Sequence, residues 1–370
     1  MKRILHVLGG LDRGGAESFV MNTARTIDKS KYKLTIATFL PPQNGKEYAY
    51  QEELNELGIK VIKIPDTRFS HPAKFANAVR RIIRSENIDV LHSHIDLMSA
   101  LTLWGAFLGG VKHRIAHSHN TNNQRLNSGA NVVVASFLRF VIKILATEKI
   151  SCGCEAGDFL FGKHAKVTVI PNGIDVQKFM FSKKARAALR KQYKISPEAT
   201  VLLNVGRLEA QKNQLYLLDI FDLYLKKHPQ AYLFIVGDGS LKADLEKRCE
   251  ELKLAKRVFL VPALGNINEY YSLADFFVLP SLFEGVPIVG IEAQASGLKC
   301  VLSDRTPAET ALVPGTKFVG INPEDLNTWV ETISEPLPTS ARVKQNTDAK
   351  IMSYDITKTV KKLEKIYAAK

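Results

Sequence analysis

Short apolar runs that fit buried β-strands alternate with helical segments along almost the whole chain. The predicted strands of the first half lie at 2–8, 33–39, 60–64, 89–92, 114–117 and 167–170, with helices at 16–27, 48–57, 72–85, 97–108 and 131–146. The strands of the second half are predicted at 200–205, 232–236, 258–260 and 275–279. A helix between successive strands supplies the crossover that parallel pairing requires. The chain is therefore predicted to have an α/β fold with doubly wound parallel sheets.

The turn Pro-Asn-Gly-Ile-Asp at 171–175 divides this alternating pattern in two, because it breaks any regular element. A chain of 370 residues has room for two domains, each with its own core. We expect one domain over residues 1–174 and a second over 175–353. Residues 354–370 are predicted to form an amphipathic helix.

The segment Ser281 to Gly297, SLFEGVPIVGIEAQASG, leads from a buried strand through a glycine loop into a helix. Pro287 fits the first helical position, where its missing N–H costs nothing, and Gly297 fits the position after the helix end. Three backbone amides then surround the positive end of the helix dipole, those of Gly285, Val286 and Ile288. This helix end is predicted to attract an anion such as a phosphate.

Two glutamates flank this anion site, Glu284 in the loop and Glu292 in the second turn of the helix. Carboxylates repel phosphate but accept hydrogen bonds from hydroxyls, so amides beside carboxylates suit a ligand with both phosphate and polyol groups. A nucleotide sugar is such a ligand. The alternative is that Glu284 only caps the helix and that Glu292 is a solvated surface residue.

Cations and glycines follow two other predicted strands. Arg207 and Lys212 come after the strand at 200–205, at the edge where parallel sheets bind ligands, and can neutralise a diphosphate. The loop at 9–15, GGLDRGG, either lets backbone amides approach a diphosphate or is only a tight turn. It lacks the Lys-Ser/Thr pair of a P-loop and the spacing of a dinucleotide fingerprint, so no cofactor is predicted.

Taken together, these motifs resemble those of the retaining glycosyltransferases of family 4. The matching strings are E-G-x-P-x-x-x-x-E from Glu284 to Glu292, G-R-L-x-x-x-K-N at 206–213, G-G-A-E at 14–17 and P-N-G-I-D at 171–175. The resemblance covers nearly the whole chain and is strongest to bacterial exopolysaccharide and capsule enzymes. It implies a GT-B fold, in which two Rossmann-like domains face each other across a cleft. The first domain would take the acceptor and carry the helix at 354–370, and the second would hold the donor.

The resemblance also implies roles for single residues. Glu284 would contact the donor sugar and Glu292 the ribose hydroxyls. Arg207 and Lys212 would bind the donor diphosphate, and His119 would hydrogen-bond the donor sugar near the reacting carbon. The other donor-binding positions would be Gly14, Gly15, Gly237, Gly285, Val286, Pro287 and Ile288.

Two predicted strands end in the same tripeptide, His92-Ser93-His94 and His117-Ser118-His119. Histidines two residues apart share one face of a strand, so four imidazoles are expected to gather at one sheet edge. Such a cluster can bind zinc, but no fixed carboxylate or cysteine accompanies it, so no metal site is predicted. His94 and His117 are weaker site candidates than His119, because buried histidines bonded to the backbone are common.

The formal net charge of +14 favours phosphate-bearing partners. No aromatic-interleaved basic stripe supports a nucleic-acid module, so an anionic membrane surface and phosphorylated substrates rank above nucleic acid. The apolar run after Met1 is too short for a signal peptide, and no stretch reaches the roughly 18 apolar residues of a membrane span. A cytoplasmic protein is therefore expected, with peripheral attachment to the inner face of the cell membrane as an option.

The helix at 131–146, NVVVASFLRFVIKILA, is apolar nearly all round apart from Arg139 and Lys143. We favour a buried helix, because helices that lie on membranes have a more polar back face. The alternative is a surface that meets lipid, with the cations at the head groups. Arg125 in the preceding loop is a candidate border of the acceptor site.

The expected reaction is transfer of a sugar, most simply from a UDP-linked donor, to a hydroxyl of a glycan on a polyprenyl diphosphate. The resemblance implies retention at the anomeric carbon. The chain contains no Asp-x-Asp motif, so no divalent metal is expected at the diphosphate. Val261-Pro262 stands where the family usually carries a glycine, which leaves the donor base open. A nucleotide-sugar 2-epimerase of the same architecture and a catalytically inactive partner subunit are the alternatives.

Overall fold

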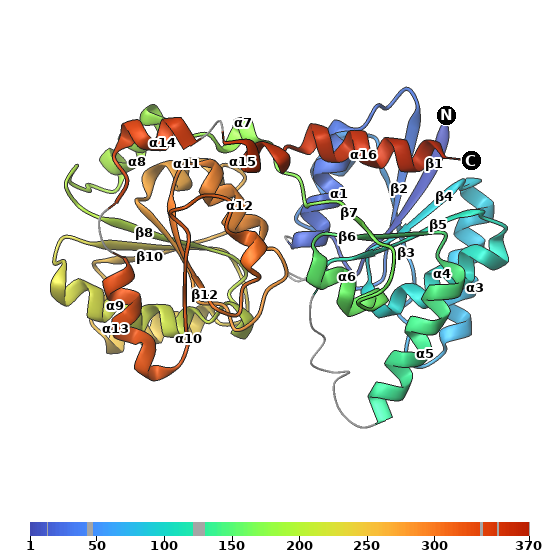
Figure 1. The fold of residues 1–370 in the computed structure, drawn as a ribbon, viewed down its shortest axis with the longest axis horizontal. Coiled ribbons are helices and arrows are strands. Elements are labelled where there is room, and N and C mark those ends of the chain that lie inside the picture. Colours follow the sequence, from blue (N-terminus) through green and yellow to red (C-terminus); the bar gives the residue numbers. More distant parts are fainter. Residues whose placement is uncertain (13, 43–46, 121–129, 334–335, 346–347, 370) are drawn as a thin grey trace. The chain divides into compact units, whose positions relative to one another are not determined.

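The structure of the protein, a computed structural model, describes residues 1–370 except 13, 43–46, 121–129, 334–335, 346–347 and 370. It contains two compact units (Figure 1). Unit 1 is Met1–Gly173 with Ile356–Lys370, and unit 2 is Ile174–Asp355. Each unit is built on one sheet whose paired strands are all parallel. The predicted α/β fold with two doubly wound parallel sheets is confirmed.

The sheet of unit 1 has seven strands in the order β3-β2-β1-β4-β5-β6-β7. They are β1 (Lys2–Val7), β2 (Tyr32–Thr38), β3 (Lys60–Lys63), β4 (Val90–Ser93), β5 (His113–Ser118), β6 (Glu148–Ser151) and β7 (Thr168–Val169). The order reverses between β1 and β4, so the chain leaves these two strands toward opposite faces of the sheet. Space for a ligand opens at the carboxyl ends of strands at such a reversal.

Helices cover both faces of this sheet and bury a hydrophobic cluster on each. One face is covered by α1 (Gly15–Thr26), α2 (Gln51–Glu56) and α16 (Ile356–Ala368). The other is covered by α3 (Pro72–Glu86), α4 (Ser99–Gly109), α5 (Ala130–Leu145) and α6 (Cys154–Phe161), with the short 3-10 turn η1 (Asp96–Met98) before α4.

The sheet of unit 2 has six strands in the order β10-β9-β8-β11-β12-β13. They are β8 (Val201–Val205), β9 (Tyr232–Val236), β10 (Val258–Val261), β11 (Phe276–Leu279), β12 (Lys299–Ser303) and β13 (Lys317–Val319). The order reverses between β8 and β11. The apolar run that predicted a strand buried on both faces is β11, whose four residues are all buried.

Helices again form a hydrophobic cluster on each face. The first face carries α7 (Val176–Phe179), α8 (Lys183–Gln192), α11 (Ile267–Leu273), α12 (Ile288–Ala295) and α15 (Ala349–Ser353). The second carries α9 (Gln214–Lys227), α10 (Lys242–Glu251) and α13 (Leu326–Thr332). The remaining short elements are η3 (Ala210–Lys212), η4 (Ala308–Thr310), η5 (Pro323–Asp325) and α14 (Thr339–Gln345).

The C-terminal helix α16 is part of unit 1 although the whole of unit 2 precedes it in the chain. Its apolar face, which includes Leu363 and Tyr367, is buried in the cluster that also holds residues of α1. The Tyr367 hydroxyl lies 2.7 Å from Nδ1 of His92 in β4. The ammonium group of Lys2 donates to the carbonyl of Tyr367 (2.8 Å) and so satisfies a free carbonyl at the helix end. These contacts attach the end of the chain to its first strands.

The interpretation of residues 131–146 as a buried helix is wrong for one face of α5. Leu138 and Ile142 are buried in the hydrophobic cluster that covers this face of the sheet. Phe137 and Phe140, in contrast, are 63% and 58% exposed. The hydrophobic spacing could not distinguish a buried helix from one with an exposed apolar face, because both faces of this helix are apolar. Only the packing of the neighbouring elements decides which face is covered.

Replacing Tyr367 by alanine should destabilise unit 1 by about 3–5 kcal/mol, because it opens a cavity in the core and leaves His92 without its hydroxyl partner. Tyr367→Phe, which removes only the hydroxyl, should cost about 1 kcal/mol. Amide hydrogen exchange measures this locally, with faster exchange expected in β1 and β4 and unchanged exchange in β8 and β11. Equal protection of β1 and β4 in wild type and Tyr367→Ala would contradict the packing of α16 described here.

Candidate functional site

In unit 2 the loops that leave β8 and β11, at the reversal of strand order, are joined by hydrogen bonds. The amide of Leu282 donates to the carbonyl of Gln211 (2.8 Å), and the Gln211 side chain donates to the carbonyl of Phe283 (3.0 Å). Ligands of such sheets bind outside the carboxyl ends of the strands at this point. Most of the site residues predicted in the second half of the chain lie on these two loops, which therefore form the candidate site.

Asn213 also joins the loops. Its residue type and its place directly before the helix at 214–227 predict a side-chain cap, which the structure does not show. It precedes α9 in the left-handed conformation, with φ of 55°, and its side chain makes no cap hydrogen bond to the helix. Instead its amide group donates to the carbonyl of Pro280 (3.1 Å). The interpretation of Asn213 as a side-chain cap is wrong, because a capping side chain depends on the extended backbone that residues at this position usually adopt.

Two predicted site residues meet directly. The ammonium nitrogen of Lys212 lies 2.6 Å from Oε1 of Glu284, and the two side chains are only 13% and 7% exposed. A carboxylate removed from water in this way needs a charged or hydrogen-bonding partner. The pair therefore fixes the position of both charges and ties the loop after β8 to the loop after β11.

Arg207 lies on the same loop as Lys212, and its side chain is exposed. Its carbonyl accepts a hydrogen bond from the side chain of Gln214 (2.9 Å), which holds the backbone in place. The turn after β9 packs closely on this loop, since a Cβ on Gly237 would collide with the carbonyl oxygen of Gly206. Gly237 thus supports the loop that carries the two cations, and a side chain there would displace it.

The helix α12 begins at Ile288, one residue later than predicted. Pro287 is the residue before the first turn, with φ −70° and ψ 116°, so its placement at the first helical position is wrong by one residue. Gly297 follows the helix end in the left-handed conformation (φ 69°), as predicted. Within the described residues, the backbone amides of Gly285 and Val286 have no backbone hydrogen-bond partner. They lie beside the positive end of α12, which favours an anion.

Glu292 is not a solvated surface residue. Its Oε2 accepts a hydrogen bond from the hydroxyl of Tyr271 (2.7 Å), which is itself fully buried in α11. Burial raises the pKa of Glu292 to about 7, against the opposing effects of the Tyr271 hydrogen bond and the charge of Lys178. The carboxyl group is thus poised between its two protonation states near neutral pH, and a ligand hydroxyl that donates to it would favour the charged form. Sequence reasoning found Glu292 but not Tyr271.

In unit 1 the loop after β1 leads into α1 at Gly15. Gly14 precedes the helix with extended backbone, and a Cβ on it would collide with the carboxylate of Glu17. A Cβ on Gly15 would meet nothing within 4 Å. Packing therefore does not require glycine at Gly15, whereas close approach of a ligand to its backbone would.

The predicted histidine cluster forms and contains a fifth member. Side chains from β1, β4, β5 and the residues that follow them are all buried, those of His6, His92, His94, His117 and His119. Sequence reasoning missed His6. The signal was its place in the first strand, because β1 pairs with β4 in a register that sets His6 opposite His92.

The imidazoles are hydrogen-bonded to one another rather than to the backbone. His94 is in the middle of one chain, with Nε2 2.9 Å from Nδ1 of His6 and Nδ1 2.9 Å from Nε2 of His119. In the other chain, Nε2 of His92 lies 3.1 Å from Nδ1 of His117. Burial lowers the pKa of His6 and His119 to about 3, so both rings are uncharged near pH 7.

Two sets of three histidines bring ring nitrogens within 4.8 Å of one another, His6 with His92 and His94, and His94 with His117 and His119. The rings of His117 and His119 are stacked, however, with centroids 4.0 Å apart and planes 28° apart. In the first set, the rings of His6 and His94 are also stacked, with planes 14° apart. A nitrogen lone pair lies in the plane of its ring, so stacked rings do not direct their lone pairs at one ion. The cluster therefore fits a network of neutral, hydrogen-bonded imidazoles better than a metal site.

His119 is also held through its backbone. Its amide donates to Oδ1 of Asp96 (3.2 Å), and the side chain of Asn120 donates to Oδ2 of Asp96 (2.6 Å). Burial raises the pKa of Asp96. Sequence reasoning missed Asp96, and it placed Arg125, which lies outside the described residues, at the border of the acceptor site.

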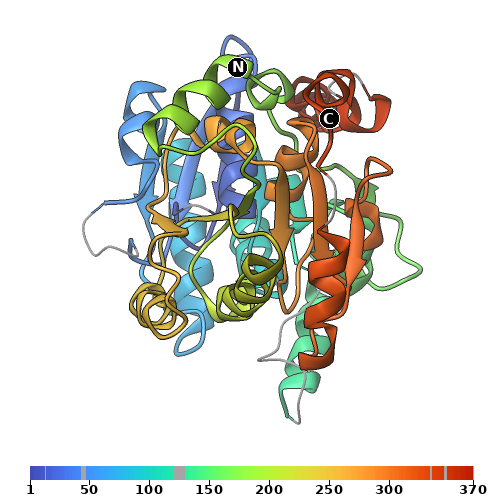
Figure 2. The same ribbon diagram turned by 90° about the vertical axis from the view of Figure 1, so that its left-hand side faces the viewer.

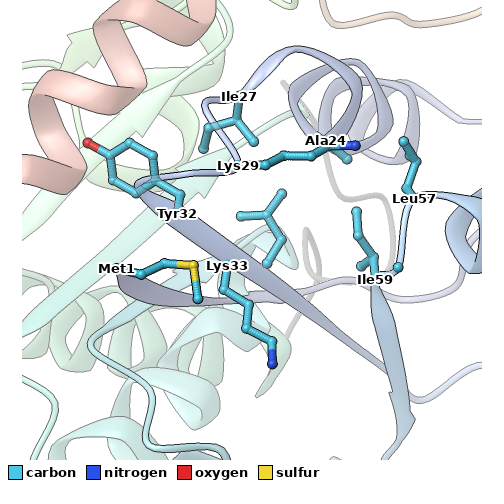
Figure 3. A pocket seen from close by; sticks show the side chains of 10 residues that line it. Met1, Ala24, Ile27, Lys29, Tyr32, Lys33, Leu57 and Ile59 are labelled. Carbon is cyan, nitrogen blue, oxygen red and sulfur yellow. The ribbon is translucent and has the colours of Figure 1, made fainter.

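A pocket of about 140 Å³ lies elsewhere in unit 1, between the start of β2 and the segments beside it (Figure 3). Met1, Tyr32 and Lys33 line it, so it is at the amino ends of β1 and β2. Parallel sheets bind their ligands at the opposite edge. None of the predicted site residues lines this pocket.

The family model of glycosyl transferases group 1 matches residues 185–349, and the model of glycosyltransferase family 4 matches residues 13–178. EpsF of Bacillus subtilis, which is assigned as a glycosyltransferase, is 32% identical over 338 residues, covering 90% of this chain and 87% of EpsF. The capsular polysaccharide biosynthesis glycosyltransferase CapH of Staphylococcus aureus is 27% identical and covers 100% of this chain and 99% of CapH.

Two further matches are to one enzyme and one solved structure whose names include a UDP-linked sugar. An Escherichia coli UDP-Gal:alpha-D-GlcNAc-diphosphoundecaprenol alpha-1,3-galactosyltransferase is 29% identical over 231 residues, 60% of each chain. The crystal structure of HepE of Anabaena in complex with UDP-glucose superposes with a TM-score of 0.79 at 17% identity, covering 99% of both chains. At this identity the second similarity concerns the fold alone.

The raised pKa of Glu292 predicts a specific pH dependence of stability. Between the ordinary value of 4.5 and the folded value of about 7, the native state binds a proton more tightly than the unfolded chain. This residue's contribution to the free energy of unfolding is therefore largest below about pH 4.5 and is lost as the pH rises through about 7. Glu292→Gln cannot titrate and should lose this dependence.

The measurement is the difference in free energy of unfolding between wild type and Glu292→Gln, from urea titrations at several pH values. The difference between the two proteins is needed because the buried neutral histidines, which both contain, make the free energy of unfolding rise with pH, opposite to the effect of Glu292. Relative to the variant, wild type should become less stable from about pH 5 to about pH 8. The exposed Glu250→Gln is the control and should show no such trend. If the free energy of unfolding changed with pH in the same way for Glu292→Gln and wild type, the raised pKa of Glu292 would be refuted.

Proposed function

The chain belongs to the glycosyltransferases of group 1 and family 4, with the GT-B fold, and on this premise we propose that it transfers a sugar from a UDP-linked donor to a lipid-linked glycan. The polymer would be an exopolysaccharide or capsule, as the similarity to CapH supports. The single observation that carries the proposal is the Lys212–Glu284 pair, which joins the two loops at the strand reversal of unit 2.

The donor diphosphate is assigned to the cations and amides of these loops. Arg207 extends an exposed guanidinium from the same loop as Lys212, and the amides of Gly285 and Val286 lie beside the positive end of α12. Guanidinium groups and helix-end amides are the usual partners of phosphate oxygens. Gly14 and Gly15 are assigned to the donor phosphates as well, which is consistent with the open space around Gly15.

The sugar ends of the donor are assigned to the carboxylates. Glu284, held by Lys212, would accept a hydrogen bond from a hydroxyl of the donor sugar, and Glu292 would accept from the ribose hydroxyls. His119 would hydrogen-bond the donor sugar near the anomeric carbon as a neutral imidazole, which its lowered pKa supports.

The proposed reaction is a front-side displacement with retention. The acceptor oxygen forms its bond to the anomeric carbon on the face from which the bond to the phosphate oxygen breaks. The proton of the acceptor hydroxyl passes to the departing diphosphate, and the products are UDP and the extended glycan. Arg207 and Lys212 would stabilise the negative charge that develops on the leaving group, without a divalent metal.

The acceptor is proposed to be a glycan on a polyprenyl diphosphate, which the similarity to the galactosyltransferase acting on a diphosphoundecaprenol substrate supports. The enzyme would work in the cytoplasm, peripherally attached to the inner face of the membrane, and would need no nucleic-acid partner. Among the described residues, no helix has both the length and the apolar character needed to cross a membrane.

Lys212→Ala and Arg207→Ala should each weaken UDP binding by about 10- to 100-fold, the range expected for a charge-assisted hydrogen bond to phosphate. Isothermal calorimetry with UDP measures the effect. Lys247→Ala, which removes an exposed cation from α10, is the matched control and should leave the affinity unchanged. Wild-type affinity in both site variants would rule out the assigned diphosphate site.

Sugar transfer to a lipid-linked acceptor should proceed in EDTA and give a product with the anomeric configuration of the donor, measured by UDP release and by NMR of the glycoside. A strict requirement for added manganese would contradict the proposed metal independence. Conversion of the donor to an isomer without any acceptor would instead identify a 2-epimerase.

A further inference from the structure

The outer face of α5 is apolar and exposed along its described length. Its exposed side chains are Val133 (72%), Phe137 (63%), Phe140 (58%) and Ile144 (61%). Their spacing of four, three and four residues places them on one side of the helix. A surface helix of a soluble protein normally carries polar residues on this side, so a continuous apolar stripe marks a surface that meets another apolar phase.

The neighbouring helix extends this apolar surface. α4 packs against α5 and exposes Phe107 (55%) and Leu108 (42%). Figure 1 and Figure 2 both show α5 at the outside of unit 1, with its first turns extending beyond the neighbouring helices of that unit. Two adjacent helices of unit 1 thus expose large apolar side chains that its own core does not cover.

A cationic pocket lies beside the stripe. Its volume is about 210 Å³, and it is lined by Arg139, Phe140, Lys143, Lys149 and Phe161. Phe140 belongs to both the stripe and the pocket. Three of the five lining residues are cations, and none of the described lining residues is a carboxylate. The pocket is therefore suited to a phosphate group at the edge of an apolar surface.

The guanidinium of Arg139, in the middle of α5, is held in place. The Nε of Arg139 donates to the carbonyl of Phe159 (3.0 Å), and its guanidinium lies 5.4 Å from the centroid of the Phe159 ring. Lys149 comes from β6, so the pocket is built from both a helix and the sheet. A fixed guanidinium loses little freedom when it binds phosphate, which favours a specific head-group contact over a loose charge patch.

We propose that this face of α5 is the site where the protein docks on an anionic lipid surface. Val133, Phe137, Phe140 and Ile144 enter the boundary between head groups and acyl chains, and the pocket of Arg139, Lys143 and Lys149 holds a phosphate-bearing head group. The inference deepens the proposed function, on which it rests for the lipid-linked acceptor, by assigning the membrane partner to named residues.

Charge favours a lipid partner over a second copy of the chain. Two copies that met through their α5 faces in a symmetric dimer would bring two sets of Arg139 and Lys143 close together without carboxylates to balance them. An anionic lipid surface supplies both things that the face lacks, an apolar layer and negative charge. The net charge of +14 acts in the same direction.

Vesicle co-sedimentation of the purified full chain tests the proposal without donor or acceptor. Vesicles of phosphatidylcholine alone are compared with vesicles that also contain phosphatidylglycerol. Wild type should bind the anionic vesicles, more weakly as salt rises. Phe137→Ser/Phe140→Ser and, separately, Lys143→Glu should each bind about tenfold or more weakly, since one removes apolar insertion and the other reverses a charge.

Matched controls separate the face from general effects. Phe69→Ser removes a ring that is 74% exposed elsewhere in unit 1, and Lys247→Glu makes the same charge change in α10 of unit 2. Both should bind vesicles as wild type does. Lys143→Arg should also retain binding, because it keeps the charge. All variants are at exposed positions, and circular dichroism melting curves check that each is folded.

The outcomes are distinct. Loss of binding in the α5 variants, with binding kept in the controls, supports the docking surface. No binding of wild type to anionic vesicles, or full binding by both α5 variants, overturns it. A dimer in size-exclusion chromatography that Phe137→Ser/Phe140→Ser dissociates, without vesicle binding, overturns it in favour of a second copy. UDP affinity is measured on the same variants and should be unchanged, so failure of docking is distinguishable from failure of the proposed sugar transfer.

Discussion

The reversal of strand order between β8 and β11 is the constraint on which the candidate site depends. Because the chain leaves these strands toward opposite faces, two loops end side by side at the carboxyl edge of the sheet, where a crevice forms without any special sequence. The residues then refine it. Gln211 ties the loops together, because its carbonyl accepts from the amide of Leu282 and its side chain donates to the carbonyl of Phe283. The Lys212–Glu284 pair places a cation and a carboxylate 2.6 Å apart in a nearly buried position.

Much of this arrangement was accessible from the sequence, because the signals are local. The buried run of β11, the glycine after α12 and the alternation of strands and helices follow from hydrophobic spacing and turn chemistry within short windows. Parallel topology then brings the ends of these strands to one edge, which is why the sequence alone predicts that Glu284, Arg207 and Lys212 lie close together. The errors at Pro287 and Asn213 concern single backbone conformations that spacing does not determine.

What the sequence could not give depends on contacts between distant segments. Tyr271, the hydrogen-bond partner of Glu292, lies 21 residues earlier in the chain, in α11. The burial that raises the pKa of Glu292 comes from the packing of α11 against α12. His6 joins the histidine cluster only through the register of β1 on β4. The exposed face of α5 was misjudged for the same reason, since an evenly apolar helix does not reveal which side its neighbours leave uncovered.

The central claim is that the two loops at the β8–β11 reversal hold a nucleotide diphosphate, and amide hydrogen exchange of the whole chain with and without UDP tests it most directly. Exchange should slow at 206–213 and 284–292 when UDP binds, while the amino ends of β1 and β2 around Met1 and Tyr32 exchange unchanged. Unaltered exchange at both loops in the presence of saturating UDP, or protection confined to the pocket near Met1, would contradict the account.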